Sequence, residues 1–332
     1  MSQDHEAVHG ECDQAVTAVG HHTNVYEPVY SGALSFMRRR YSKDYRDASV
    51  DVVVSGVPFD LGTSNRPGTR FGPRGIREAS AQLAWGGPHW PWQFDTFALL
   101  NVIDWGDVSF EYGNPQEMLD KVEAHADEIL GAGKSLLSLG GDHLVTLPLL
   151  RAHARHLGEL VLIHFDAHTD TYEETGRFDH GSMFKHAVRE GLIDPDHSVQ
   201  IGIRTDYTRK GHRFKVLDGD WVQNHPLQAT LDKIRETVGD RRAYLSFDID
   251  CLDPCYAPGT GTPVCGGLTS NQALQILRGL VDVDLVGMDL VEVAPIYDVG
   301  QITSLAGAHV AMEYLCVRAA QKQKSQGGAS TA

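Results

Sequence analysis

The sequence predicts an α/β protein in which a parallel β-sheet lies between two layers of helices. Short apolar runs alternate with helix-like segments along most of the 332 residues, and this alternation is typical of parallel sheets. The runs are apolar on both faces, as in strands that helices cover on each side. No linker rich in proline, glycine or serine divides the middle of the chain. We therefore predict one large domain.

The expected elements follow one another at short intervals from residue 51 onward. Two segments between the apolar runs, 116–130 and 271–280, have the apolar spacing of amphipathic helices. Residues 1–45 show little periodicity and are predicted to form an N-terminal arm, with the domain over 46–322 and a polar tail over 323–332. The predicted strands are 51–57, 99–103, 135–139, 160–165, 199–203, 243–247 and 285–288.

Charge and composition argue against several classes of protein. The formal net charge of −15 disfavours nucleic-acid binding, which depends on clustered Lys and Arg, and is compatible with steering a small cation. No apolar run approaches the roughly 20 residues that span a bilayer. The acidic, polar N-terminus does not resemble a signal peptide, and five scattered cysteines do not indicate a disulfide framework. We expect a cytoplasmic protein with neither a nucleic-acid nor a membrane partner.

Acidic and histidine side chains follow three predicted strands at the point where each strand ends. HFDAHTDTY, residues 164–172, holds Asp166, His168 and Asp170 at alternate positions, which share one face if the strand continues. SFDIDCLDP, residues 246–254, repeats this spacing with Asp248 and Asp250. In open α/β sheets, ligands bind beyond the carboxyl ends of the strands. These side chains are therefore expected to meet.

The third strand end is LGGDH, residues 139–143, which adds His143. An Asp at one strand end is often only a helix cap or a turn former, but three such ends together indicate a metal site. His164 is expected to be a buried histidine beside the site rather than a seventh ligand. The predicted ligands are His143, Asp166, His168, Asp170, Asp248 and Asp250.

The ligand set predicts both the metal and the reaction. Six side chains are too many for one tetrahedral zinc ion with an open position, and they suit two cations that share a carboxylate. Oxygen-rich donors with only two imidazoles favour Mn²⁺, although Ni²⁺, Co²⁺ or Zn²⁺ can also occupy such sites. A metal pair lowers the pKa of a bridging water and provides hydroxide near neutral pH. We therefore predict two Mn²⁺ per subunit and a hydrolytic reaction.

GGDH, DAHTD and SFDIDCLDP together resemble the motifs of the ureohydrolases, the family that includes arginase and agmatinase. The resemblance runs from about Val52 to the C-terminal helix, includes FDHGSMF, HSVQIGIRT and GMDLVEVAP, and is strongest to the bacterial agmatinases. It implies a three-layer α/β/α fold of the arginase/deacetylase type with about eight parallel strands. It also implies a binuclear Mn²⁺ site and a homo-trimer or homo-hexamer.

The resemblance also implies roles for individual residues. Asp166 and Asp248 match bridging carboxylates, His180 matches a proton-shuttling histidine, and Glu292 matches the acid that grips a guanidinium group. In this scheme a metal-bridging hydroxide attacks the guanidinium carbon. Asp170 then passes the proton of the nucleophile to the departing amine. The products are urea and a primary amine.

The residues after DAHTD bear on which guanidino compound reacts. Arginases carry Asn and Ser groups there for the α-carboxylate and α-amine of arginine, whereas this chain has Glu173 and Glu174. Acidic groups suit agmatine, which would yield putrescine and urea. Arg177 suits a guanidino acid instead, so a guanidinobutyrase or guanidinopropionase is the alternative. A further alternative is a non-catalytic regulatory subunit, which the complete set of ligands together with His180 and Glu292 disfavours.

Overall fold

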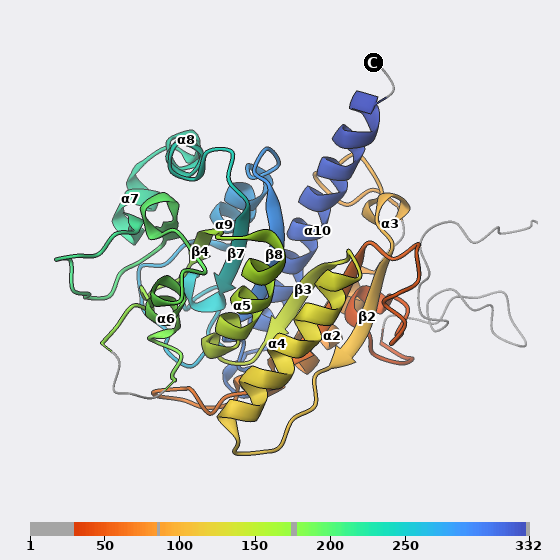
Figure 1. Cartoon of the computed structure of the whole chain (residues 1–332), viewed down its shortest axis with the longest axis horizontal. Helices are drawn as coiled ribbons and strands as arrows, with labels where there is room; N and C mark the ends of the chain where they lie inside the picture. The colour runs from red at the N-terminus through yellow and green to blue at the C-terminus, as the bar shows by residue number, and fades with distance from the viewer. Residues whose placement is uncertain (1–29, 85–86, 174–177, 330–332) are drawn as a thin grey trace, which may run out of the picture.

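The computed structural model describes residues 30–84, 87–173 and 178–329, with side chains as far as Ser325. These residues form one eight-stranded sheet in which every pairing is parallel, with helices on both faces (Figure 1). The predicted three-layer α/β/α fold is confirmed. The strands are β1 Val52–Val57, β2 Val102–Asp107, β3 Ser135–Gly140, β4 Val161–Phe165, β5 Val199–Ile201, β6 Lys215–Leu217, β7 Ala243–Asp248 and β8 Leu285–Val291.

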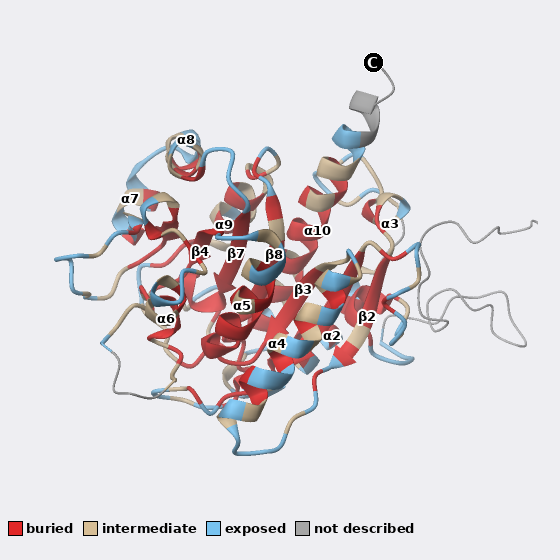
Figure 2. Cartoon of the chain, in the orientation of Figure 1, coloured by how far each residue is buried: buried red, intermediate tan, exposed pale blue. Residues whose placement is uncertain are grey.

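Helices cover the sheet because successive strand residues contribute to two different cores. Val52 and Val54 of β1 belong to one core and Val53 to the other, as the alternation of side chains along a strand requires. The helices α4, α5 and α6 pack on the core that contains Val53, and α2, α8, α9 and α10 pack on the other. Figure 2 shows the strands buried between the two layers. The helices are α2 Gly72–Ser80, α3 Thr96–Leu99, α4 Pro115–Gly131, α5 Thr146–Leu157, α6 Met183–Arg189, α7 Gly219–Asn224, α8 Leu227–Val238, α9 Ser270–Arg278 and α10 Ile302–Ala329.

Two strands differ from the sequence prediction. The prediction of a strand over 99–103 is wrong at its start, because Leu99 ends α3 and β2 begins at Val102. The side chain of Asp95 accepts a hydrogen bond from Phe97 N and begins this short helix. The eighth strand, β6, was not predicted, because it has only three residues at the edge of the sheet and its first side chain, Lys215, is exposed.

The order of the strands brings distant parts of the chain together. The order in the sheet is β2-β1-β3-β8-β7-β4-β5-β6. β3 and β4 follow one another in the sequence but are separated in the sheet by β8 and β7. The carboxyl ends of β3, β8, β7 and β4 are therefore neighbours at the centre of the sheet. In open α/β sheets this is where ligands bind.

Part of the segment predicted as an arm packs against the domain. Phe36 and Met37 lie in the 3₁₀ helix η1, Phe36–Arg38, and are fully buried in the larger core. Phe36 N donates to Asp104 Oδ2 of β2 at 2.6 Å. At the other end, α10 continues to Ala329, into the segment predicted as a polar tail. None of the helices in the described part of the chain is long and apolar enough to cross a membrane.

Candidate active site and metal centre

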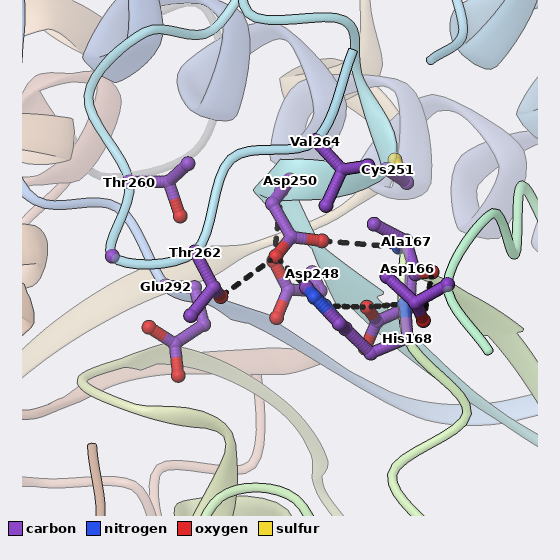
Figure 3. Close-up of polar contacts among 12 residues, drawn as sticks. Asp166, Ala167, His168, Asp248, Asp250, Cys251, Thr260, Thr262, Val264 and Glu292 are labelled. Carbon is purple, nitrogen blue, oxygen red and sulfur yellow. Dashed lines mark hydrogen bonds and ion pairs between the residues drawn. The ribbon is translucent and has the colours of Figure 1, made fainter. Parts of the chain in front are cut away.

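The six predicted ligands converge at the carboxyl ends of β3, β4 and β7. His143 opens the 3₁₀ helix η4, His143–Val145, directly after β3. Asp248 ends β7, and Asp250 lies in the 3₁₀ helix η6, Ile249–Cys251. Asp166 follows the last residue of β4. Figure 3 shows Asp166, Asp248 and Asp250 around the His168 ring, with Glu292 beside them.

Three carboxylates surround one nitrogen of His143. Its Nδ1 lies 2.9 Å from Asp170 Oδ2, 3.1 Å from Asp166 Oδ2 and 3.2 Å from Asp248 Oδ2. Despite these distances, Nδ1 makes no hydrogen bond of acceptable geometry to any described residue. His143 and Asp166 are fully buried, and Asp170 and Asp248 are almost so. This nitrogen and these oxygens form the first candidate metal group.

The other nitrogen of His143 shows which ring atom carries the hydrogen. Nε2 lies 2.8 Å from Ser246 Oγ, and that hydroxyl donates to Asp289 Oδ1 at 2.7 Å. Because the Ser246 hydroxyl gives its hydrogen to Asp289, it accepts from His143 Nε2–H. In the neutral ring, Nδ1 then has a lone pair that faces three carboxylates. This nitrogen and the three carboxylate oxygens can together coordinate a divalent cation. Buried carboxylates this close together require either a cation or a proton between them.

A second group lies beside the first and shares Asp166 with it. His168 Nδ1 is 3.2 Å from Asp166 Oδ1 and 3.2 Å from Asp250 Oδ2. Asp166 thus faces His143 with Oδ2 and His168 with Oδ1. Asp250 Oδ2 also accepts from Thr262 Oγ1 at 3.1 Å, as Figure 3 shows. Two adjacent groups with a common carboxylate match the ligand arrangement of a two-metal site.

The backbone after β4 differs from the extended conformation that was predicted. The strand ends at Phe165, so Asp166, His168 and Asp170 do not share one face. Asp166 Oδ1 accepts from His168 N at 2.6 Å and forms a tight turn. Asp170 has a φ of 50°, in the left-handed region. The turn directs His168 to the second group and Asp170 to the first.

The crowding of buried acids shifts the pKa values of several residues in the site. Burial, and then the nearby Asp250 and Asp166 carboxylates, raise the pKa of Asp248 well above its usual range. Burial and Asp166 likewise raise the pKa of Asp170 to about 7. Burial opposes protonation of His143, but the surrounding carboxylates outweigh it and raise the pKa of this imidazole. Protons on Asp170, Asp248 and His143 thus offset the repulsion between these carboxylates, and a bound cation would take over that role.

Glu292 follows β8 and contacts the predicted ligand His143 and the predicted catalytic residue His180. Its Oε1 accepts from His143 N at 2.9 Å and lies 2.8 Å from His180 Nδ1. Its Oε2 is buried and has no hydrogen-bond partner among the described residues. Its φ of 65° lies in the left-handed region, which costs a residue with a Cβ about 1–2 kcal/mol. Such an outlier is typical of functional positions.

The sequence analysis missed several residues that support the site. Ser64 contacts His180 Nε2 through its Oγ at 2.7 Å and its N at 2.9 Å; no local pattern predicts this contact, because 116 positions separate the two residues. Asp289 supports His143 through Ser246. An acidic residue inside the apolar run of β8 was the signal that could have revealed it, since a buried charge requires a partner.

The residues that bear on the substrate are only partly within the described chain. Glu173 is exposed and lies 2.8 Å from Lys185 Nζ, so this acid already has a cationic partner. Glu174 and Arg177 lie outside the described residues.

Comparisons with known proteins agree with this geometry. The arginase family model matches residues 50–316. The chain belongs to the arginase family. Its sequence is 56% identical over 294 residues to an agmatinase of Neisseria meningitidis serogroup C, which covers 89% of this chain and 95% of that protein. The ureohydrolase family predicted from GGDH, DAHTD and SFDIDCLDP is thus confirmed.

Solved structures of the arginase family superpose closely. A hypothetical agmatinase from Burkholderia thailandensis has a TM-score of 0.88 and 50% identity, over 96% of each chain. Proclavaminate amidino hydrolase from Streptomyces clavuligerus has a TM-score of 0.84 and 41% identity, over 89% of this chain and 100% of that one. Together with the curated relatives, these identities show that the protein is an enzyme, a ureohydrolase of the agmatinase type.

Proposed function

We propose that the protein hydrolyses agmatine to putrescine and urea with two Mn²⁺ per subunit. The observation that carries this proposal is the unpaired, buried Oε2 of Glu292 beside the two candidate metal groups. A buried carboxylate oxygen without a donor is costly and is suited to a planar cation that offers two N–H groups. Agmatinases with 53–56% identity over about nine-tenths of the chain support agmatine as that cation.

The ligand atoms suit two divalent ions. His143, Asp166, Asp170 and Asp248 would hold one ion, and Asp166, His168 and Asp250 the other. The resemblance to the family adds Asp248 as a second carboxylate shared by both ions. When bound, such a pair lowers the pKa of a shared water and supplies a nucleophile near neutral pH. The excess of carboxylate oxygen over imidazole favours manganese.

Glu292 would orient the substrate over these ions. Because His143 N and His180 Nδ1 already occupy Oε1, only Oε2 remains for the guanidinium group. Gly261 borders this space, since a side chain there would begin 3.5 Å from Oε2. Glycine at this position leaves room for the flat cation.

His180 would move a proton between the site and the departing amine. The Ser64 N–H can only donate, so His180 Nε2 accepts from it and Nδ1 carries the hydrogen directed at Glu292. Burial lowers the pKa of His180, but the Glu292 carboxylate outweighs it and raises the value to about 9. Uptake of a proton at Nε2 would exchange the contact with Ser64 N–H for donation to the Ser64 hydroxyl, which lies 2.7 Å away.

Urea release from a panel of substrates tests the proposal. We expect the Mn²⁺-loaded protein to release urea from agmatine and hardly any from arginine, 4-guanidinobutyrate or 3-guanidinopropionate. Preference for a guanidino acid would contradict agmatine as the substrate. That outcome is a specific alternative, because proclavaminate amidino hydrolase is also similar to this chain. The homo-trimeric or homo-hexameric assembly and the cytoplasmic location stay predictions.

A further inference from the structure

A row of polar side chains crosses the interior of the sheet directly beneath the metal ligands. On the neighbouring strands β8, β7, β4 and β5, the register pairs Asp289 with Ser246, Ser246 with His164, and His164 with Gln200. All four residues are fully buried. Polar side chains in buried strands are costly unless each has a partner. Asp289 and Ser246 hold His143, which leaves His164 and Gln200 to be explained.

His164 and Gln200 form a chain of hydrogen bonds that begins at Asp166. His164 Nε2 lies 2.8 Å from Asp166 Oδ2, and His164 Nδ1 lies 3.1 Å from Gln200 Nε2. Gln200 Nε2 also donates to Thr169 O at 2.7 Å. Gln200 Oε1 lies 2.9 Å from Nε2 of His212, a half-buried residue in the loop between β5 and β6.

The backbone carbonyl of Thr169 sets the direction of the whole chain. A carbonyl can only accept, so it is the amide nitrogen of Gln200 that faces Thr169 and His164. His164 Nδ1 must then accept, and Nε2 carries the hydrogen that it donates to Asp166. At the far end, Gln200 Oε1 accepts from His212 Nε2–H. That ring donates through Nε2–H in this arrangement and still does so when it is protonated.

This direction excludes His164 as a metal ligand, although it lies among the ligand atoms. One of its ring nitrogens is within 4.8 Å of the ligand atoms of His143, Asp166 and Asp170, and Nε2 is the one that contacts Asp166. A nitrogen that carries a hydrogen has no lone pair to give to a metal. The Phe184 ring packs against the imidazole with 4.6 Å between centroids and keeps it from turning.

We propose that His164, oriented by Gln200, is a positioning residue that holds the Asp166 carboxylate for two metal ions. Asp166 belongs to both candidate metal groups, so its orientation governs both ions together. The proposal rests on the two-manganese site of the proposed function. Loss of a hydrogen-bond partner behind a metal ligand typically costs 10–100-fold in metal affinity.

Titration of the metal-free, full-length protein with MnCl₂, with free Mn²⁺ measured by EPR, tests this role. We expect His164→Leu to weaken binding of both ions by about 10–100-fold. His164→Gln should restore most of the affinity, because its amide N–H can donate to Asp166. Gln200→Leu should show a smaller loss in the same direction. The control is His125→Gln, which removes a half-buried histidine on α4 that contacts Ser55 and no part of the site.

The outcomes separate this proposal from the proposed function. Wild-type affinity in His164→Leu contradicts the positioning role alone. Equal losses in His164→Leu and His164→Gln, confined to one ion per chain, show that His164 is a ligand and also overturn it. A wild-type chain that binds no Mn²⁺ contradicts the proposed function and this proposal together. If His164→Leu does not fold by circular dichroism, Gln200→Leu decides, and wild-type affinity in that variant overturns the proposal.

Discussion

At the scale of single residues, Glu292 has two oxygens in different situations. One is saturated by His143 N and His180 Nδ1, and the other is buried without a partner among the described residues. The backbone at this position adopts a left-handed φ of 65°. Strain and an unsatisfied oxygen both reduce stability. Their coincidence at one residue indicates that a ligand completes the site.

We expect Glu292→Gln to lower kcat/KM for agmatine by on the order of 100-fold or more, because a charged hydrogen-bonding partner of the guanidinium is lost. Manganese content should stay near wild type, because Glu292 is in neither metal group. Steady-state kinetics and elemental analysis measure the two quantities. Glu111→Gln, at an exposed position before α4, is the matched control. Unchanged kinetics in Glu292→Gln would mean that another residue binds the guanidinium group.

At the scale of elements, helix α9, which follows the loop after η6, begins at a capping motif of its own. Thr269 Oγ1 accepts from Gln272 N at 3.0 Å, and the Gln272 side chain accepts from Thr269 N at 2.9 Å. This reciprocal capping begins α9. Arg204 holds the preceding loop by donating to backbone carbonyls that include those of Asp250 and Val264. The loop is therefore fixed at both ends.

Thr269→Ala should lower the free energy of unfolding by about 1 kcal/mol, because the cap of α9 is lost. Urea denaturation of the metal-free protein measures this quantity without a contribution from bound ions. Asn271→Ala, an exposed change in the first turn of the same helix, should stay within about 0.5 kcal/mol of wild type. Equal losses in the two variants would show that propensity, rather than capping, determines the start of α9.

Elements were predictable from the sequence where an apolar run is long enough to be buried on both faces. The central strands β3, β4 and β7 meet this condition, and each was predicted within one residue of its bounds. The edge strand β6 has no apolar run and could not be recognised. The start of β2 was misplaced because Leu99 and Leu100 continue the apolar pattern backward into α3. The hydrophobic pattern of a sequence therefore predicts which residues are buried, and it predicts helix or strand only indirectly.

At the scale of the whole molecule, strand order creates the site. That the six candidate ligands lie close together could be predicted because each follows an apolar run by at most five residues. Their division into two groups could not, because it depends on turns after β4 and β7 and on the insertion of β8 and β7 between β3 and β4. Contacts between distant loops, such as Ser64 with His180, leave no local pattern at all. Tertiary structure decides these features.

Anomalous diffraction from crystals grown with MnCl₂ tests the two-manganese centre most directly. We expect two manganese peaks per chain at roughly 3.5–4 Å from each other, the usual separation in two-metal sites. One should be bonded to His143 Nδ1 and the other to His168 Nδ1, with Asp166 bonded to both. A single peak, or a peak bonded to His164 Nε2, would contradict the account.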